Sequence, residues 1–449
     1  MQPVITIVGR ANVGKSTLYN RLTRSREAIV DDFPGVTRDR MVGRGAVGDQ
    51  AFWVIDTGGY ESGVSSDLDD AVQHQFQHAL DESDAVILVV DAQAGLSTGD
   101  EHIVDRLRGG DVPIYIAANK SEGMDSDVAI AEFYSLGIGS ALFPVSAKHG
   151  SGIQEMMLEI LPPTEESASE AADTADEIPR VAILGKPNAG KSTLANKLVG
   201  TERMIVSEIA GTTRDSVGTH FSCHGREYYL IDTPGVRRRS RISEKLERLS
   251  IVKALQTMEQ AHVILLVIDA RVGITEQDAR LAGLIQEAGR GMVLVINKWD
   301  GLESHQKTRV RRGLDTALPF LESVPVMFVS AKFGSSVDKI MPAVQRVYES
   351  VMANLGTGKL NSALRRAVEA QPPPRVGRQQ IKLKYAHQGG KNPPTVVIHG
   401  NLLNKVPESY KRYLARSISR EFELAGTRVA LWFKTSGNPY VRTRSRVRP

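Results

Sequence analysis

The feature that most constrains this chain is a phosphate-binding loop that occurs twice. The pattern is glycine, four residues, glycine-lysine, then serine or threonine, and it is found at Gly9–Ser16 and at Gly185–Ser192. Each copy follows an apolar run typical of a strand, Val4–Val8 or Val181–Leu184, and precedes a segment of helical character. In that setting the glycines let main-chain N–H groups turn toward phosphate oxygens, and the positive end of the following helix points at the same anion. The chain is therefore predicted to contain two phosphate-binding sites.

All residues of the two loops are candidate ligands of a nucleotide's phosphates. The lysine of each loop is expected to reach the β- and γ-phosphates, and the serine hydroxyl to bind Mg²⁺. The first loop consists of Gly9, Arg10, Ala11, Asn12, Val13, Gly14, Lys15 and Ser16. The second consists of Gly185, Lys186, Pro187, Asn188, Ala189, Gly190, Lys191 and Ser192.

The duplication extends to a whole domain. Landmarks recur 176 residues later at Asp56 and Asp232, and 184 residues later at Ser146 and Ser330, a period far longer than that of solenoid repeats. In the first copy, apolar runs alternate with mixed segments, which predicts a mostly parallel α/β sheet with helices on both faces and a ligand at the carboxyl ends of the strands. The predicted strands are Val4–Val8, Ala51–Ile55, Ala85–Val90, Pro113–Ala118 and Leu142–Val145.

Composition divides the chain into five segments. Two α/β domains are predicted at residues 1–161 and 180–354. Between them, residues 162–179 hold six acidic residues and no basic ones, which indicates a flexible linker. Residues 355–436 are expected to form a small α+β domain, and residues 437–449 a basic tail without structure of its own.

In the third domain the predicted order is helix, strand, strand, helix, strand. Pro372–Pro374 breaks the first helix, and Pro407 lies near the start of the second. We expect Gly389–Gly390 and Pro393–Pro394 in the loop between the first two strands. The expected helices are 360–370 and 407–424, and the expected strands are 380–385, 395–399 and 428–433.

Each loop is followed by a second motif, Asp-x-x-Gly, at the end of a predicted strand. The aspartate can hold Mg²⁺ directly or through water, and the N–H of the last glycine can bond to the γ-phosphate, so that the motif senses its presence. With the residue that follows each motif, the candidates are Asp56, Thr57, Gly58, Gly59 and Tyr60, and Asp232, Thr233, Pro234, Gly235 and Val236.

A threonine between these motifs is predicted to complete each magnesium site. Thr37 and Thr213 belong to Gly-x-Thr-Arg-Asp stretches, and each can close on Mg²⁺ only when the γ-phosphate is bound. The predicted magnesium ligands are Ser16, Thr37 and Asp56 in the first copy and Ser192, Thr213 and Asp232 in the second.

Two further motifs are predicted to bind the base. The carboxylate of Asp300 can accept hydrogen bonds from the N1–H and the exocyclic amine of guanine, a donor pair that adenine lacks, so the expected ligands are GTP and GDP. The first copy has Glu122 instead, one methylene longer, and we expect weaker or less selective binding there. A Ser-Ala-Lys stretch can add a backbone N–H toward the guanine oxygen. The base-site candidates are Asn119, Lys120, Ser121, Glu122, Ser146, Ala147 and Lys148, and Asn297, Lys298, Trp299, Asp300, Ser330, Ala331 and Lys332.

The residues after Asp-x-x-Gly predict slow hydrolysis. Many GTPases place glutamine there to orient water, but Tyr60 and Val236 cannot do so by side-chain hydrogen bonding. Our hypothesis is that Asn12 and Asn188 help to bind K⁺ beside the phosphates, as the corresponding asparagine does in GTPases of similar pattern. The candidates for catalysis are Asn12, Lys15, Thr37, Asn188, Lys191 and Thr213.

The charge of the chain is unevenly distributed. The formal net charge is +4, but residues 355–449 alone carry 19 Lys and Arg against 4 Asp and Glu. A basic segment of this kind indicates RNA or another polyanion as a partner, and a solvated basic face that keeps the protein soluble is the alternative. A single cysteine excludes an internal disulfide and fits the cytoplasm, and no apolar run is long enough for a membrane span. We expect a monomer that binds neither membrane nor DNA.

With the phosphate loop, Asp-x-x-Gly, Asn-Lys-x-Asp and Ser-Ala-Lys in this order, each copy is similar to the G domains of translation-factor-class GTPases. Two such domains followed by a small basic α+β domain resemble, over essentially the whole chain, the bacterial ribosome-assembly GTPases called Der or EngA. Lys382–Ala386 and Asn392–Thr395 carry the match to that family's KH-like domain. The sequence departs from the family at Ala11, where proline is usual, and at Glu122.

The resemblance implies two tandem P-loop G domains and a KH-like domain that act in assembly of the large (50S) ribosomal subunit. It also implies GTP hydrolysis, binding to that subunit and its rRNA, and domain rearrangement controlled by the nucleotide. The basic segment can neutralise rRNA phosphates. However, the third domain lacks a clear Gly-x-x-Gly loop of the RNA-clamping kind, so docking on a G domain is an alternative role for it. Two rival functions stay open, an RNA-modifying GTPase and an rRNA-binding scaffold with inactive nucleotide sites.

Overall fold

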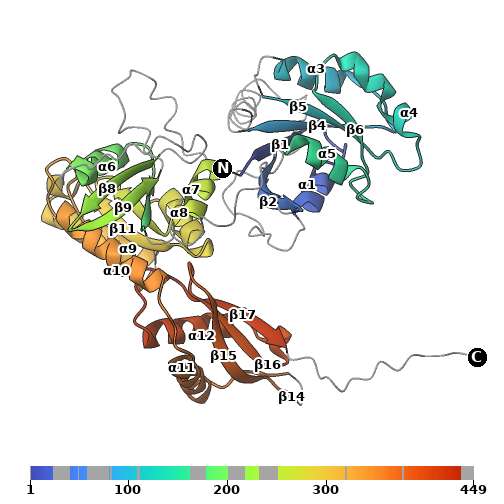
Figure 1. Ribbon diagram of the computed structural model, residues 1–449. Coiled ribbons are helices and arrows are strands. Elements are labelled where there is room, and N and C mark those ends of the chain that lie inside the picture. The colour runs from blue at the N-terminus through green and yellow to red at the C-terminus, as the bar shows by residue number, and fades with distance from the viewer. Residues whose placement is uncertain are drawn as a thin grey trace, which may run out of the picture. The chain divides into compact units, whose positions relative to one another are not determined.

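The computed structural model describes most of both α/β domains and of the third domain (Figure 1). The described residues are 2–23, 41–48, 50–57, 80, 83–108, 112–161, 178–200, 218–231, 251–318, 321–376 and 379–435. The predicted linker lies outside them except for Ile178 and Pro179, and so does the predicted tail. Two compact units are present, one around the first α/β domain and one containing the second α/β domain together with the third domain.

The first domain is a six-stranded sheet with strand order β2-β3-β1-β4-β5-β6. All neighbouring strands are parallel except β2, which runs antiparallel to β3. Its strands are β1 (Val4–Val8), β2 (Met41–Val47), β3 (Gln50–Asp56), β4 (Ala85–Asp91), β5 (Ile114–Asn119) and β6 (Ala141–Pro144). Its helices are α1 (Lys15–Thr23), α3 (Thr98–Leu107), α4 (Ser126–Ala131), η1 (Glu132–Leu136) and α5 (Ile153–Ile160).

The second domain repeats this topology, with order β8-β9-β7-β10-β11-β12 and only β8 antiparallel to its neighbour. The predicted domain duplication is therefore confirmed. Its strands are β7 (Arg180–Gly185), β8 (Gly218–Cys223), β9 (Arg226–Ile231), β10 (Val263–Asp269), β11 (Gly291–Asn297) and β12 (Val326–Phe328). Its helices are α6 (Lys191–Gly200), α7 (Ile251–Gln260), α8 (Glu276–Glu287), η3 (Trp299–Gly301), α9 (Ser304–Ala317), η4 (Val337–Lys339) and α10 (Ile340–Val351).

The central strands are apolar on both sides because helices cover both faces of each sheet. All seven residues of β4 are buried. Ile87 and Val89 belong to the core beneath α1 and α5, while Val86 and Leu88 belong to the core beneath α3. A parallel strand that is buried on both faces needs a continuous apolar run. The central strands could therefore be predicted from the sequence.

The edge strand β2 was not among the predicted strands. It contains Gly43 and Gly45, and glycine is depleted in strands. Both glycines are needed for close packing: a Cβ on Gly43 would lie 2.5 Å from the Tyr19 hydroxyl oxygen, and one on Gly45 would lie 2.6 Å from the Phe52 ring. The two glycines are thus the reason why the strand was not predicted, and they are also what lets α1 and β3 pack closely against it.

The third domain has the predicted helix-strand-strand-helix-strand order, with a short added hairpin. Its sheet has the order β15-β16-β17, antiparallel in the first pair and parallel in the second. One prediction was wrong: Gly389–Gly390 forms the end of β15 and not a loop, because Gly390 pairs with Thr395 and Gly389 packs against Val397. The elements are α11 (Thr357–Ala370), β13 (Arg375–Val376), β14 (Gln379–Gln380), β15 (Lys382–Gly390), β16 (Thr395–Asn401), η5 (Leu403–Lys405), α12 (Glu408–Glu421) and β17 (Ala430–Thr435).

Within the second unit the third domain docks on the second α/β domain through main-chain hydrogen bonds. The Met292 N–H, at the start of β11, donates to the Gly426 carbonyl at 2.7 Å, and the Gly426 N–H donates to the Ser323 carbonyl at 2.8 Å. A Cβ on Gly426 would lie 2.6 Å from the Met292 oxygen, so the approach requires glycine. None of the helices in the described part of the chain has the length and apolar composition needed to cross a bilayer.

Candidate nucleotide-binding sites

The two phosphate loops have the same conformation. Each joins the end of the first strand of its sheet to the first helix, as predicted. In the first loop Gly9, Asn12 and Gly14 have φ of 152°, 66° and 99°, and the second loop has 148°, 61° and 96° at the equivalent positions. Lys15 Nζ donates to the Arg10 carbonyl at 2.6 Å, and Lys191 Nζ donates to the Lys186 carbonyl at 2.7 Å. Each lysine thus folds back across its own loop, with its ammonium group on the side where phosphates would bind.

A buried asparagine connects the phosphate loop to the base-binding motifs. In the first domain Asn119 Nδ2 donates to the Val13 carbonyl at 2.8 Å, and its Oδ1 accepts from the Ala147 N–H at 2.8 Å. In the second domain Asn297 makes the same two bonds, to Ala189 at 2.8 Å and from Ala331 at 3.0 Å. The structure therefore brings three of the predicted motifs together around one buried side chain in each domain.

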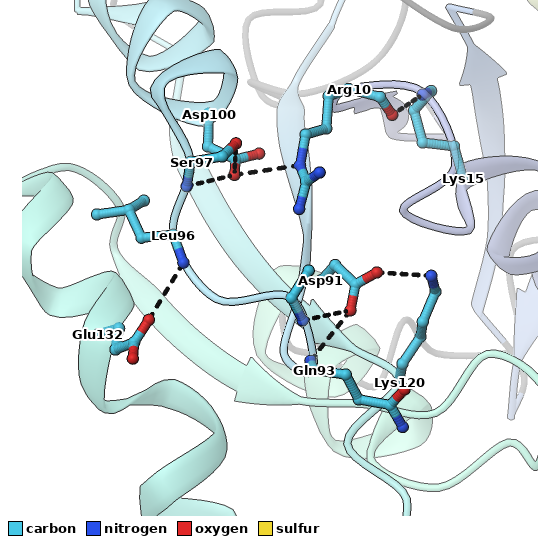
Figure 2. A network of polar contacts seen from close by, with 10 residues as sticks. Arg10, Lys15, Asp91, Gln93, Leu96, Ser97, Asp100, Lys120 and Glu132 are labelled. Atoms are coloured by element: carbon cyan, nitrogen blue, oxygen red, sulfur yellow. Dashed lines mark hydrogen bonds and ion pairs between the residues drawn. The ribbon is translucent and has the colours of Figure 1, made fainter.

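The lysine of the base motif is held by an aspartate that the sequence analysis missed. Lys120 Nζ donates to Asp91 Oδ2 at 2.6 Å, at the end of β4, while Asp91 Oδ1 accepts from the Gln93 N–H (Figure 2). Burial alone would raise the pKa of Asp91, but the hydrogen bond and charge of Lys120 together with the Ala94 and Gln93 N–H groups outweigh it, and the pKa is lowered. Lys298 pairs with Asp269 at 2.6 Å in the second domain. Aspartate recurs at the ends of the equivalent strands β4 and β10, and this recurrence in the sequence could have revealed the residue.

A second unpredicted aspartate anchors each phosphate loop to a helix. Arg10 Nε lies 3.3 Å from Oδ2 of the fully buried Asp100, and the Ser97 hydroxyl donates to the same oxygen at the start of α3 (Figure 2). In the second domain, Lys186 Nζ lies 3.5 Å from Asp278 Oδ2 at the start of α8. A cation at the second loop position is thus held by a helix-capping carboxylate in both copies.

The donors suited to Mg²⁺ are adjacent in the first site. Ser16 Oγ donates to Asp56 Oδ2 at 3.1 Å, and a hydroxyl and a carboxylate are the hard oxygen ligands that this ion prefers. Burial lowers the pKa of Lys15, with the Asp56 carboxylate opposing the shift. The predicted positions Thr37, Gly58, Gly59 and Tyr60, and Thr213 and Asp232–Val236 of the second site, lie outside the described residues.

The predicted base-reading carboxylates occupy equivalent settings. The hydrogen bond from Ser146 lowers the pKa of Glu122, and the hydrogen bond from Ser330 lowers the pKa of Asp300. Among the described residues, Glu122 Oε2 has no hydrogen-bond partner. Both side chains are therefore ionised acceptors at neutral pH, as recognition of a two-donor base edge requires.

We predict that Gly190→Ala disrupts the second site. A Cβ there would lie 2.2 Å from Asn297 Nδ2, at a φ of 96° that alanine rarely adopts. The backbone strain alone should destabilise the protein by about 1–3 kcal/mol, and displacement of Asn297 should weaken GTP binding at this site. Thermal unfolding and calorimetric titration with GTP measure the two effects. Gly283→Ala is the matched control, because a Cβ there meets nothing within 4 Å and alanine favours the helix α8. Equal behaviour of the two variants would contradict the assigned role of Asn297.

Comparison with known proteins gives the same assignment along the chain. A family model described as "50S ribosome-binding GTPase" matches residues 4–120 and 180–298. A second model, the KH-domain-like C-terminal domain of EngA bacterial GTPase enzymes, matches residues 354–434.

Curated relatives match over the full length. GTPase Der of Thioalkalivibrio sulfidiphilus is 47% identical over 452 aligned residues, covering 100% of this chain and 97% of the relative. GTPase Der of Methylococcus capsulatus is 45% identical and covers 98% of this chain and 95% of the relative. The solved structure of Era in complex with MgGDPNP and a segment of 16S ribosomal RNA is 26% identical, covers 58% of this chain and 94% of that chain, and has a TM-score of 0.30.

Proposed function

This chain belongs to the Der (EngA) family of GTPases, and on that premise we propose that it acts in the cytoplasm in assembly of the large ribosomal subunit. As a member of a ribosome-associated GTPase family it hydrolyses GTP, with Mg²⁺ at the phosphates. In the proposal, the nucleotide at each G domain sets the arrangement of the domains, and the arrangement decides whether the protein binds the subunit and its rRNA.

One observation supports the nucleotide half of this proposal above all. In both G domains a buried asparagine joins the phosphate loop to the Ser-Ala-Lys loop by two hydrogen bonds of 2.8–3.0 Å. An inactive relic of a duplicated domain would not need to keep this geometry in both copies. This support of the phosphate loop is therefore present in both domains.

The RNA half is supported by a basic face on the KH-like domain. Arg412, Arg416 and Arg420 lie four residues apart along α12 and are all exposed. They line a surface groove together with Ser409, Tyr413 and Ser417. Evenly spaced arginines on one helix face can contact successive phosphates of a nucleic acid, a contribution that depends strongly on salt.

The docking of the KH-like domain suggests how the nucleotide could be sensed. Its Gly426 bonds to Met292 at the start of β11, and the same strand ends at Asn297 in the second nucleotide site. One buried strand therefore connects the site to the docked domain. This supports our proposal that nucleotide state and domain arrangement are coupled, with docking on the second G domain as one role of the KH-like domain.

Sedimentation of the full chain with ribosomal subunits on sucrose gradients tests the function. We expect the protein to migrate with the large subunit when a non-hydrolysable GTP analogue is present and to be released with GDP. Removal of the residues after Ser436 should weaken the interaction. Equal migration in both nucleotide states would contradict the proposed control by nucleotide, and absence of migration in either state would contradict the ribosomal role.

The two rival functions lack support. An RNA-modifying GTPase needs a reactive group outside the G domains, yet the single cysteine, Cys223, is buried in the second G domain. Among the described residues there is also no cluster of three His, Cys, Asp or Glu that could hold a catalytic metal. A scaffold with inactive sites would show no GTP turnover, which phosphate release by the purified full chain measures directly.

We predict that Glu122→Asp strengthens guanine-nucleotide binding at the first site. Glu122 and Asp300 both accept from the serine of the Ser-Ala-Lys stretch, so shortening the side chain should place the carboxylate where Asp300 places its own. Improving one charged hydrogen bond should raise affinity by about tenfold. The measurement is calorimetric titration of the full chain with the second site disabled by Lys191→Ala. The reverse change, Asp300→Glu in a chain disabled by Lys15→Ala, should lower affinity, and unchanged affinities would refute the assigned difference.

We predict that GTP turnover is faster in K⁺ than in Na⁺ by at least about tenfold, a small part of what an arginine finger contributes. Asn188 is exposed at the top of its loop, with φ of 61°, where its carboxamide oxygen can bind a cation. Asn188→Gly removes the carboxamide but keeps this backbone conformation accessible, and it should abolish the preference for K⁺. Asn196→Gly, at an exposed position of α6, is the control. Equal rates in the two salts for the wild type would exclude a potassium site.

A further inference from the structure

The sheet of the KH-like domain has one face that its own helices do not cover. Ala386, Val396 and Ile398 are fully buried in the domain core, together with residues of α11 and α12. Their neighbours along the strands point to the opposite side. The pairing registers place these neighbours in two adjacent rows, which we call the outer sheet face: Tyr385, His399 and Lys434 in one row, and His387, Val397 and Trp432 in the next.

Aromatic rings make up most of the outer sheet face. Tyr385 is 45% exposed and Trp432 is 59% exposed, values that are unusual for rings of this size on a folded domain. The His387 and His399 rings lie 5.2 Å apart and nearly parallel, and Tyr385 lies 5.7 and 5.8 Å from them. One strand separates Tyr385 from Trp432, a distance of about 10 Å, so each ring can receive its own planar ligand.

The charged side chains of the three strands have one sign. The three strands β15, β16 and β17 contain no aspartate or glutamate. Lys384, which is the extra residue at an irregularity in the pairing of β15, is exposed, and so is Lys434. The face therefore combines exposed rings with positive charge, which matches a ligand that carries flat bases on a negatively charged backbone.

We propose that the outer sheet face is a stacking platform for the unpaired bases of a single-stranded RNA segment. This proposal rests on the proposed ribosomal function. It is more specific than that function, because it states that this face binds unpaired RNA and not duplex RNA. Bases stack on Tyr385 and Trp432, while Lys384 and Lys434 contact the phosphates between them. Sheets that present aromatic residues bind unpaired RNA in this way, and such stacking tolerates any base.

Three other occupants fit the chemistry less well: a second copy of the chain, an apolar protein partner and the chain's own tail. The rings of a second copy or an apolar protein partner would gain nothing from the lysines and would bury their charge. The chain's own Arg-rich tail follows β17 directly in the sequence, but it carries the same sign of charge as Lys384 and Lys434. A polyanion is the partner that satisfies both the rings and the charges.

The test uses the full chain and a short unstructured RNA labelled with fluorescein, compared with a duplex of the same length. Fluorescence anisotropy should show tighter binding of the single strand, and RNA should quench by stacking the part of the tryptophan emission that the Trp432→Leu variant lacks. Trp432→Leu and Tyr385→Leu keep apolar bulk but remove the ring, and each should weaken single-strand binding by about tenfold. Trp432→Phe should retain most of the affinity. Tyr134→Leu, which replaces a 64% exposed ring on the first G domain, should change nothing.

The outcomes separate this proposal from the one on which it rests. If the leucine variants bind single strands as well as the wild type, or lose single-strand and duplex binding equally, the platform is wrong. If Trp432 is already shielded from a soluble quencher before RNA is added, another part of the chain or a second copy covers the face, which also overturns the proposal. Sedimentation with the large subunit is measured on the same variants. If the wild type co-sediments with the large subunit but the RNA does not stack on these rings, the platform is wrong and the ribosomal function still holds. If the RNA stacks but the protein does not co-sediment, the ribosomal function is wrong and only the binding of single-stranded RNA holds.

Discussion

Lys191→Ala is expected to abolish GTP turnover at the second G domain. Lys191 is the first residue of α6, and its Nζ already lies over the phosphate loop, 2.7 Å from the Lys186 carbonyl. From there the ammonium can reach the β- and γ-phosphates, where charge develops as the bond to the γ-phosphate breaks. Loss of one such preorganised charge costs about 10²–10³-fold in rate. The measurement is phosphate release by the purified full chain under saturating GTP.

A matching variant of the first site shows how much of the GTP turnover each G domain contributes. Lys15→Ala disables the first site in the same way, and the double variant sets the background. Lys339→Ala, an exposed lysine of the second G domain, should have the wild-type rate. The fold should tolerate the changes, because burial already lowers the pKa of Lys15 and so disfavours its charge in the folded protein. Turnover that survives in the double variant would mean that the phosphate loops are not the catalytic sites.

The sequence was sufficient to predict structure and site together where one short motif determines both. A phosphate loop requires a strand before it and a helix after it, so locating Gly9–Ser16 also located β1 and α1 within a few residues. The central strands could be predicted because burial on both faces demands continuous apolar runs. β2 could not, because its glycines are explained only by the side chains of α1 and β3 that pack against it.

The unpredicted part of each site consists of contacts between distant segments. Asn119 belongs to the predicted base motif, but the motif alone does not reveal its two hydrogen bonds, which go to residues 106 and 28 positions away in the chain. Asp91 and Asp100 belong to no short motif, and they act on Lys120 and Arg10 only after folding brings the strand ends together. Such residues become visible from sequence only through the internal duplication, because Asp269 and Asp278 occupy the same places in the second copy.

Asp300→Asn is expected to exchange the base preference of the second site. Asp300 accepts a hydrogen bond from Ser330, which lowers its pKa, so the carboxylate stays ionised as the pH falls below neutrality. The neighbouring Trp299 ring packs 4.4 Å from Phe328 and holds the turn that carries it. Guanine presents two donors to this carboxylate, and both hydrogen bonds are charge-assisted. An amide accepts only one of them and places its own donor against the other, so GTP affinity should fall by about 10²–10³-fold.

Xanthosine triphosphate tests whether this loss comes from recognition or from damage to the fold. Xanthine has an oxygen where guanine has the exocyclic amine, and the amide of the Asp300→Asn variant can donate to that oxygen. We therefore expect the variant to bind and hydrolyse xanthosine triphosphate better than GTP, while the wild type prefers GTP. Competition between the two nucleotides in a chain disabled by Lys15→Ala measures the exchange, and Asp338→Asn, at an exposed position, is the control. A variant that loses GTP without gaining xanthosine triphosphate would show that Asp300 supports the turn and does not contact the base, and the choice of guanine would then have to lie in the main chain of the Ser-Ala-Lys loop.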